Sequence, residues 1–136
     1  MNGLSVELQM LWASAALGLV QIVLTVLVTL PSTGLTWAMG PRDAAPAEEV
    51  NTYACRLDRA LKNFTETFAI FAVAVILANA LGKHSHSTTL GAQLYFWCRL
   101  GYVPAYALGI PVVRTLLWAG AIVGVVLVML VIWPGV

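Results

Sequence analysis

The stretch Cys55-Arg56-Leu57-Asp58-Arg59-Ala60-Leu61-Lys62-Asn63-Phe64-Thr65-Glu66 decides how this chain folds, because it puts charged groups at the start of an apolar helix. A charged side chain at the centre of a bilayer costs about 2.5–3.5 kcal/mol on insertion scales, so it must face protein, water or a ligand. Within the stretch, Arg56, Arg59, Asn63 and Glu66 are spaced 3, 4 and 3 residues apart. At about 100° per residue they share one helical face. The sequence therefore predicts a polar stripe, called the first stripe below, on a membrane helix.

The composition indicates a membrane protein. Of the 136 residues, 60% are hydrophobic and only 10% are charged, and the mean hydropathy is +0.88. Soluble domains usually contain about 25% charged residues. The length suits one domain, residues 1–136, built from a few spanning helices without a soluble module. The net charge of +1, and the lack of a basic patch away from the ends of the predicted membrane spans, argue against nucleic-acid binding.

Four apolar stretches predict an all-α integral membrane protein, a bundle of four transmembrane helices. Turn residues, such as Pro31-Ser32-Thr33-Gly34 after the first stretch and Gly109-Ile110-Pro111 before the last, separate them. The first stretch lacks a preceding basic segment and a cleavage site, so we expect a retained span rather than a signal peptide. The expected spans are about 8–30, 52–81, 89–108 and 112–132.

Lysine and arginine are distributed unevenly around these spans. Only Lys83 lies on the side of the second loop, whereas the side of the first and third loops carries Arg42, Arg56, Arg59, Lys62 and Arg114. The positive-inside rule therefore predicts that the first and third loops are cytoplasmic and that both termini lie on the opposite side.

Two cysteines and two histidines have simple structural interpretations. Cys55 and Cys98 lie in or beside apolar segments, which favours reduced packing residues over a disulfide or a reactive thiol. His84 and His86 are two residues apart, a spacing that does not fit a helical zinc pair, and no further ligands accompany them. We interpret them as solvated loop residues and predict no metal site.

A second stripe follows in the third span. Tyr95, Arg99, Tyr102 and Tyr106 are spaced 4, 3 and 4 residues apart and share one helical face. Arg99 is about ten residues from either end of its span, too deep for its charge to reach the interface easily. Glu66 is the one carboxylate at comparable depth. The sequence thus predicts a Glu66–Arg99 ion pair, within one chain or between chains.

The two stripes allow a structural and a functional interpretation. Polar groups in membrane helices can simply hold the helices together, and one Arg–Glu pair is explained equally well in that way. Two facing stripes contain more polar groups than one ion pair requires, and they predict a site for a polar, anionic ligand at membrane depth. The arginine fork matches a carboxylate, and a tyrosine hydroxyl can donate a hydrogen bond to a developing thiolate.

The pattern Arg56-x-x-Arg59-Ala60-x-x-Asn63-x-x-Glu66 resembles the signature of the membrane-associated proteins in eicosanoid and glutathione metabolism, the MAPEG family. That family includes microsomal glutathione transferases, leukotriene C synthase and microsomal prostaglandin E synthase. Arg99-x-x-Tyr102-x-x-x-Tyr106, followed by Pro111-x-x-Arg114, resembles its third-helix motif and the start of its fourth helix. Gly40-Pro41-Arg42-Asp43 resembles bacterial members, which implies a bacterial inner membrane.

The resemblance implies a homotrimer that binds glutathione as a co-substrate between neighbouring subunits, near the cytoplasmic side of the lipid bilayer. Arg114 would stabilise the glutathione thiolate and Tyr102 would assist it, because a nearby guanidinium lowers a thiol pKa from its usual value of about 8.5. A lipophilic small-molecule substrate would enter from the bilayer between helices. The implied glutathione-binding residues are Arg56, Arg59, Asn63, Glu66, Arg99, Tyr102 and Tyr106.

Three functions follow for testing. The first is a glutathione-dependent transferase or peroxidase acting on lipophilic electrophiles or hydroperoxides. The second is a non-catalytic membrane scaffold or subunit that retains the fold. It is favoured by the absence of a cation before Arg42, where several family members carry a glutathione-contacting arginine late in the first helix. The third is a small multidrug-type transporter, which requires a membrane-embedded carboxylate in the first helix. Glu7 lies at the very start of that span and does not favour it.

Overall fold

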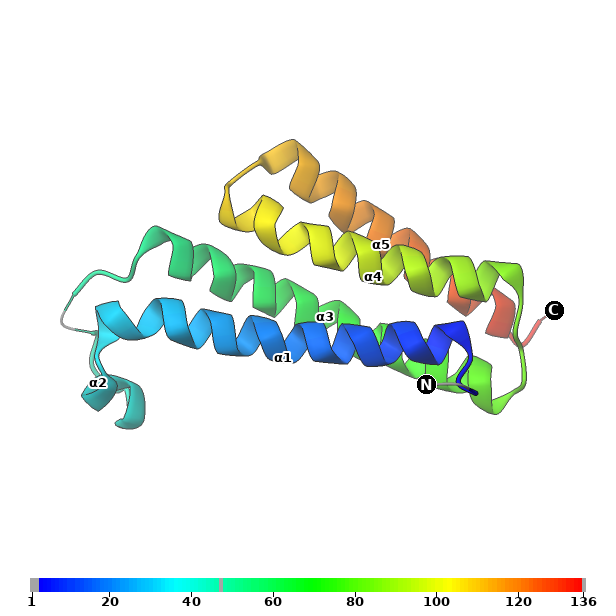
Figure 1. Cartoon of the computed structure of the whole chain (residues 1–136), viewed down its shortest axis with the longest axis horizontal. Coiled ribbons are helices and arrows are strands. Elements are labelled where there is room, and N and C mark those ends of the chain that lie inside the picture. The colour runs from blue at the N-terminus through cyan, green and yellow to red at the C-terminus, as the bar shows by residue number, and fades with distance from the viewer. Residues whose placement is uncertain (1–2, 47, 136) are drawn as a thin grey trace.

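The computed structural model describes residues 3–46 and 48–135, and within these ranges the chain forms helices and no strands. The four long helices lie side by side and alternate in direction, so that both ends of the chain lie at the same end of the bundle (Figure 1). A short helix projects at the other end. The helices are α1 (Val6–Thr33), α2 (Leu35–Met39), α3 (Thr52–Ala80), α4 (His86–Ala107) and α5 (Pro111–Ile132).

The fold agrees with the predicted all-helical membrane protein but differs in helix count. Three helices, α1, α3 and α5, are long and apolar enough to cross a membrane. The 22-residue α4 is long enough but is not among these three candidates, because its sequence includes Arg99 and several hydroxyl and amide side chains. The five-residue α2 was not predicted, because five residues are too few for a hydrophobic period to be recognised.

Local chemistry explains where the helices begin and end. The helix α1 continues through Pro31 and ends at Thr33, because Gly34 adopts a φ of 74° that glycine tolerates best. The helix therefore continues about three residues beyond the expected end at residue 30 and stops inside the turn segment Pro31–Gly34. At the start of α3, Asn51 Oδ1 accepts a 2.8 Å hydrogen bond from Tyr53 N. Pro111 occupies the first turn of α5, where its missing N–H costs nothing.

Close packing joins α4 to α5. A Cβ atom added at Gly124 would lie 2.6 Å from the carbonyl oxygen of Gly91 and 2.8 Å from the backbone nitrogen of Tyr95, so only glycine fits there. Nearby, the rings of Phe71 and Tyr95 stack with centroids 3.9 Å apart. These contacts belong to a core formed by Phe71, Ala74, Val75, Ala78, Ala92, Tyr95, Ala121, Val125 and Val128.

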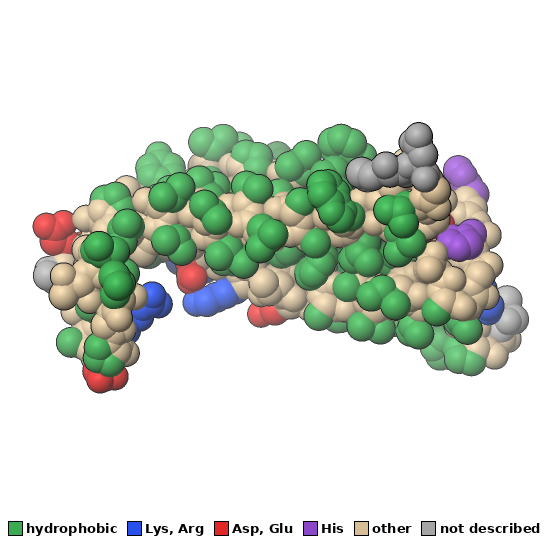
Figure 2. All heavy atoms as spheres, turned by 60° about the horizontal axis from the view of Figure 1, so that its bottom comes forward, with side chains coloured by type: hydrophobic (Ala, Val, Ile, Leu, Met, Phe, Trp, Pro, Cys, Tyr) green, Lys and Arg blue, Asp and Glu red, His purple; other side chains and the backbone are tan. Residues whose placement is uncertain are grey.

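The exterior of the bundle is apolar and its ends are polar. On the face shown in Figure 2, hydrophobic side chains cover the long helices, most charged side chains gather toward the end that carries α2, and histidines lie at the other end. An apolar exterior of this kind suits contact with lipid rather than water.

Candidate functional site

The guanidinium of Arg99 joins the two predicted stripes at the centre of the bundle. Arg99 is only 1% exposed. Its Nη1 donates to Asn63 Oδ1 at 2.6 Å and its Nη2 donates to Thr67 Oγ1 at 2.7 Å. Thr67 Oγ1 also lies 3.2 Å from the hydroxyl of Tyr95. Arg99, Asn63, Thr67 and Tyr95 are called the Arg99 network below.

The predicted Glu66–Arg99 ion pair is wrong within one chain. Glu66 is exposed and forms no salt bridge with any residue that the structure describes, and Arg99 bonds to Asn63 and Thr67 instead. On the surface of α3, Glu66 and Thr67 lie on opposite sides of Asn63, about 60° and 40° away. Arg99 lies on the Thr67 side. A pair between chains stays a prediction.

A second group of predicted residues meets around the ring of Tyr106. The guanidinium carbon of Arg114 lies 4.8 Å from the centroid of this ring, and that of Arg59 lies 6.0 Å from it. The ring of Tyr102 is 5.5 Å away, centroid to centroid. Helices α3, α4 and α5 thus each contribute a polar or cationic group to one place.

Beside this group lies a shallow hollow of about 160 Å³, called the site hollow. It is lined by Asn63, Tyr102, Arg114, Thr115 and Trp118. Within the described part of the chain, neither Arg59 nor Arg114 has a carboxylate within 4 Å. Two cations without counter-charges next to a polar hollow can hold an anion, because a guanidinium offers several N–H donors.

Arg56 has a different position from the other residues of the first stripe. Its Nη1 donates to the carbonyl oxygen of Ala107 at 3.1 Å, and its guanidinium lies against Gly109. Arg56 therefore ties the start of α3 to the end of α4. Contacts within the described residues link Arg59, Asn63, Arg99, Tyr102, Tyr106 and Arg114, whereas Arg56 bonds to the backbone of Ala107 and Glu66 is exposed.

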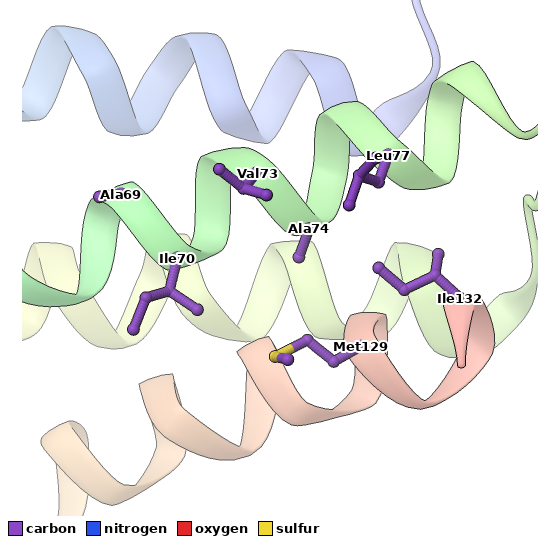
Figure 3. A pocket seen from close by; sticks show the side chains of 7 residues that line it. All are labelled: Ala69, Ile70, Val73, Ala74, Leu77, Met129 and Ile132. Carbon is purple, nitrogen blue, oxygen red and sulfur yellow. The ribbon is translucent and has the colours of Figure 1, made fainter. Parts of the chain in front are cut away.

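Another hollow, of about 350 Å³, lies between α3 and α5 nearer the end of α5. Figure 3 shows its apolar lining, with Ile70 and Ala74 on one side and Met129 and Ile132 on the other. Because its lining contains no polar side chain, it cannot orient a polar ligand. The site hollow is therefore the candidate functional site.

Comparison with known families agrees with this polar site in an apolar bundle. Residues 10–133 match the model of the MAPEG family. The chain belongs to the MAPEG family. Searches among curated proteins and among solved structures found no match. This MAPEG protein is thus a multi-pass membrane protein of the family named for eicosanoid and glutathione metabolism.

Sequence reasoning missed a second buried polar group in this MAPEG protein. Glu7 is 3% exposed. Its Oε1 accepts hydrogen bonds from Thr88 Oγ1 at 2.6 Å and Thr89 Oγ1 at 3.2 Å, and it lies 3.6 Å from His84 Nδ1. Glu7, Thr88, Thr89 and His84 are called the Glu7 network below. The sequence did contain one signal for it. The pattern Ser85-x-x-Thr88 is a capping box that marks the start of α4, and the N-terminus of a helix attracts a carboxylate.

The histidines and cysteines are placed largely as predicted. His84 and His86 are both exposed, although His86 already begins α4 instead of lying in the loop. Cys55 and Cys98 are both free thiols, as predicted.

Proposed function

We propose that this MAPEG protein is a glutathione-dependent transferase or peroxidase that acts on lipophilic electrophiles or hydroperoxides dissolved in the membrane. The position of Arg114 carries the proposal. Its guanidinium lies over the ring of Tyr106 and lines the site hollow without a carboxylate partner among the described residues. A cation held there by an aromatic face is suited to an anionic ligand such as a thiolate.

The proposed reactions need the protein mainly to stabilise the glutathione thiolate. The Arg114 guanidinium would favour the ionised form of the glutathione thiol, which is the nucleophile. In conjugation, this sulfur forms a bond to an electrophilic carbon, which releases its leaving group, and the thiol proton goes to water. In peroxide reduction, the thiolate sulfur bonds to the outer peroxide oxygen and forms a sulfenic acid, while the O–O bond breaks and the other oxygen takes a proton from water and leaves as the alcohol. The thiol of a second glutathione then attacks the sulfenic sulfur, which forms the disulfide and releases water. The hydroxyl of Tyr102, beside the same hollow, can donate a hydrogen bond to the sulfur.

The opposite charges of Arg59 and Glu66 support a zwitterionic peptide as the ligand. Both side chains are exposed, and they lie seven residues apart, two turns along α3. A carboxylate of glutathione would bind near Arg59, and its ammonium group would bind near Glu66. These pairings match one carboxylate and the ammonium group of the peptide.

The size of the site hollow supports a homotrimer. At about 160 Å³ it is smaller than the usual ligand pocket of about 300–1,000 Å³. A second subunit would complete its walls and cover the exposed side of Glu66. We therefore include the homotrimer, with glutathione between neighbouring subunits, in the proposal.

The proposal also treats α4 as a fourth span, in the inner membrane of a bacterium. Its 22 residues extend about 33 Å, enough for a hydrocarbon core of about 30 Å. It lies beside three apolar helices (Figure 1), and Arg99 is hidden from lipid. Four spans leave both termini on one side, and the arginine-rich first and third loops would be cytoplasmic. Reporter fusions at both termini test this arrangement.

Glutathione titration of the detergent-solubilised protein tests the function. We expect binding that weakens by about tenfold in Arg59→Ala and in Glu66→Ala, since each loses a charge-assisted contact. Lys62→Ala is the matched control, because Lys62 is an exposed cation on the same helix and pairs with Asp58 at 2.8 Å. Arg114→Ala should retain part of the binding but lose the ultraviolet absorbance of the bound thiolate. No binding at millimolar glutathione would overturn the proposal.

A scaffold without chemistry is the second candidate. It is favoured by the lack of a basic residue in the last turn of α1, where several family members carry a glutathione-contacting arginine. In that case Arg59→Ala and Glu66→Ala would lower the stability of the oligomer, and neither the wild type nor the variants would bind glutathione. The titration combined with size-exclusion chromatography separates the two functions.

A further inference from the structure

The orientation of the Asn63 side-chain amide follows from the chemistry of its neighbour. A guanidinium carries only N–H donors and no acceptor. The Asn63 atom that lies 2.6 Å from Arg99 Nη1 must therefore be the carbonyl oxygen Oδ1, and the NH₂ group must point the other way. The exchange of oxygen and nitrogen that is possible for most asparagines is excluded here.

Arg99 is itself held in place, so the amide cannot turn with it. Its second nitrogen donates to Thr67 Oγ1 at 2.7 Å, and the hydroxyl of Thr67 lies 3.2 Å from the backbone carbonyl oxygen of Phe64. The rings of Tyr95 and Tyr102 lie beside the guanidinium, with centroids 5.7 and 5.3 Å from its central carbon. A guanidinium that is 1% exposed and confined in this way gives Asn63 Oδ1 one stable partner.

The remaining face of Asn63 belongs to the site hollow. Asn63 is half-buried and lines the hollow, and its Nδ2 has no hydrogen-bond partner in the described ranges 3–46 and 48–135. Because Oδ1 is directed at Arg99, the NH₂ group is the part of this amide left to face the hollow, and it can only donate hydrogen bonds. Arg114, on the other wall, can also only donate.

We propose that Arg99 is a positioning residue that fixes the Asn63 amide with its NH₂ group toward the site hollow, so that the hollow selects a ligand group that accepts hydrogen bonds. The inference rests on the proposed function and adds the direction of binding. A carboxylate or carbonyl oxygen of glutathione lies against Asn63, beside the thiolate at Arg114, and its ammonium group lies outside this hollow, on the Glu66 side of α3.

The variant Asn63→Asp separates this role from a structural one. The substitution keeps the size of the side chain and gives the buried Arg99 a counter-charge, so the midpoint of thermal unfolding in detergent should stay the same or rise. It also replaces the NH₂ donor with an acceptor, so the affinity for glutathione in a calorimetric titration should fall by about 10- to 100-fold. Asn79→Asp is the matched control, at an exposed asparagine on the same helix, and both quantities should stay at the wild-type values.

Two variants of Arg99 test the positioning itself. In Arg99→Lys the ammonium group can only donate, so it can still bond to Asn63 Oδ1. In Arg99→Gln the amide oxygen can also accept a hydrogen bond from Asn63 Nδ2, so the Asn63 amide is no longer held in one orientation. Both lose the fork to Thr67 and should lose similar thermal stability. Glutathione affinity should stay within about threefold in Arg99→Lys and fall by about tenfold in Arg99→Gln.

The outcomes are distinct. Wild-type glutathione affinity in Asn63→Asp, or equal losses of affinity in Arg99→Lys and Arg99→Gln, overturns the positioning role and leaves the proposed function intact. A wild-type protein that does not bind glutathione overturns both.

Discussion

The Arg99 network and the Glu7 network both bury a charged side chain in the same bundle, and both involve α4. In the Glu7 network, two hydroxyls donate to one carboxylate oxygen at the beginning of α4, and a histidine lies beside it. In the Arg99 network, a guanidinium in the middle of α4 donates outward to two residues of α3. One of these, Asn63, also lines the site hollow.

The difference shows that burial of a charge does not by itself identify a binding site. The contacts of Glu7 all involve a single carboxylate oxygen, and they connect the start of α1 to the start of α4. The contacts of Arg99 occupy only the acceptor side of Asn63 and leave its donor side facing a hollow. The unused face of a fixed polar group, rather than the buried charge, points to a ligand.

Gly124→Ala should disturb both networks and have the largest effect. Gly91, which Gly124 contacts, lies between Thr88 and Arg99 on α4, so a Cβ 2.6 Å from its carbonyl oxygen would push α4 away from α5. Overpacking against backbone should cost about 3 kcal/mol. Unfolding in a detergent titration measures it. Gly101→Ala is the control, since its Cβ would meet only Leu117 at 3.4 Å, and equal stability of the two variants would contradict this explanation.

Arg99→Met should break the Arg99 network alone. It leaves Asn63 Oδ1 without its partner and removes one contact of Thr67, which should cost about 2–3 kcal/mol. The free energy of unfolding in detergent is the measurement. Arg59→Met removes an exposed arginine from the neighbouring helix and should change stability by less than about 0.5 kcal/mol. If Arg99→Met were as stable as Arg59→Met, the network would have no structural role.

Glu7→Gln should weaken the Glu7 network by about 1 kcal/mol. The amide oxygen can still accept from Thr88, but the charge that favours the N-terminus of α4 is lost. The same unfolding measurement applies, with the exposed Glu49→Gln as control. Because the site hollow lies elsewhere, the proposed binding of glutathione should not change. A loss of affinity in Glu7→Gln would show that the two networks are coupled.

His84→Gln should have the smallest effect. The imidazole is 42% exposed and lies 3.6 Å from Glu7 Oε1, so solvent screens the interaction. We expect a change below about 0.5 kcal/mol at pH 7. A loss as large as that of Glu7→Gln, measured side by side, would instead make His84 an equal member of the Glu7 network.

Sequence patterns predicted the long helices because hydrophobic runs and turn residues such as Gly34 act locally. They also predicted that the first and second stripes would face each other, since a charge at the depth of Arg99 must find a polar partner. They did not identify that partner. The choice between Glu66 and Thr67 depends on a rotation of less than half a turn of α3 against α4, which spacing along one helix cannot determine.

The Glu7 network was not predicted for a related reason. Glu7 and Thr88 are 81 residues apart in sequence, and the capping box at Ser85 indicates a helix N-terminus without identifying which carboxylate meets it. Arg56 was also predicted to belong to the site. In the structure its guanidinium instead donates a hydrogen bond to the backbone carbonyl of Ala107. A backbone acceptor of this kind has no sequence signal, because every residue carries one.

The polarity of α4 has a consequence for how the chain enters a membrane. Unlike α1, α3 and α5, α4 is not apolar enough to be a candidate span by its own sequence, and alone in a membrane it would leave the guanidinium of Arg99 in contact with lipid tails. Only when Asn63 and Thr67 of α3 are present does the charge find its hydrogen-bond acceptors. During synthesis α3 emerges first, so these acceptors are in place before α4 is made. If α4 spans the membrane as proposed, the order of the helices along the chain lets α3 and α4 integrate as a hairpin, and the later helix depends on the earlier one.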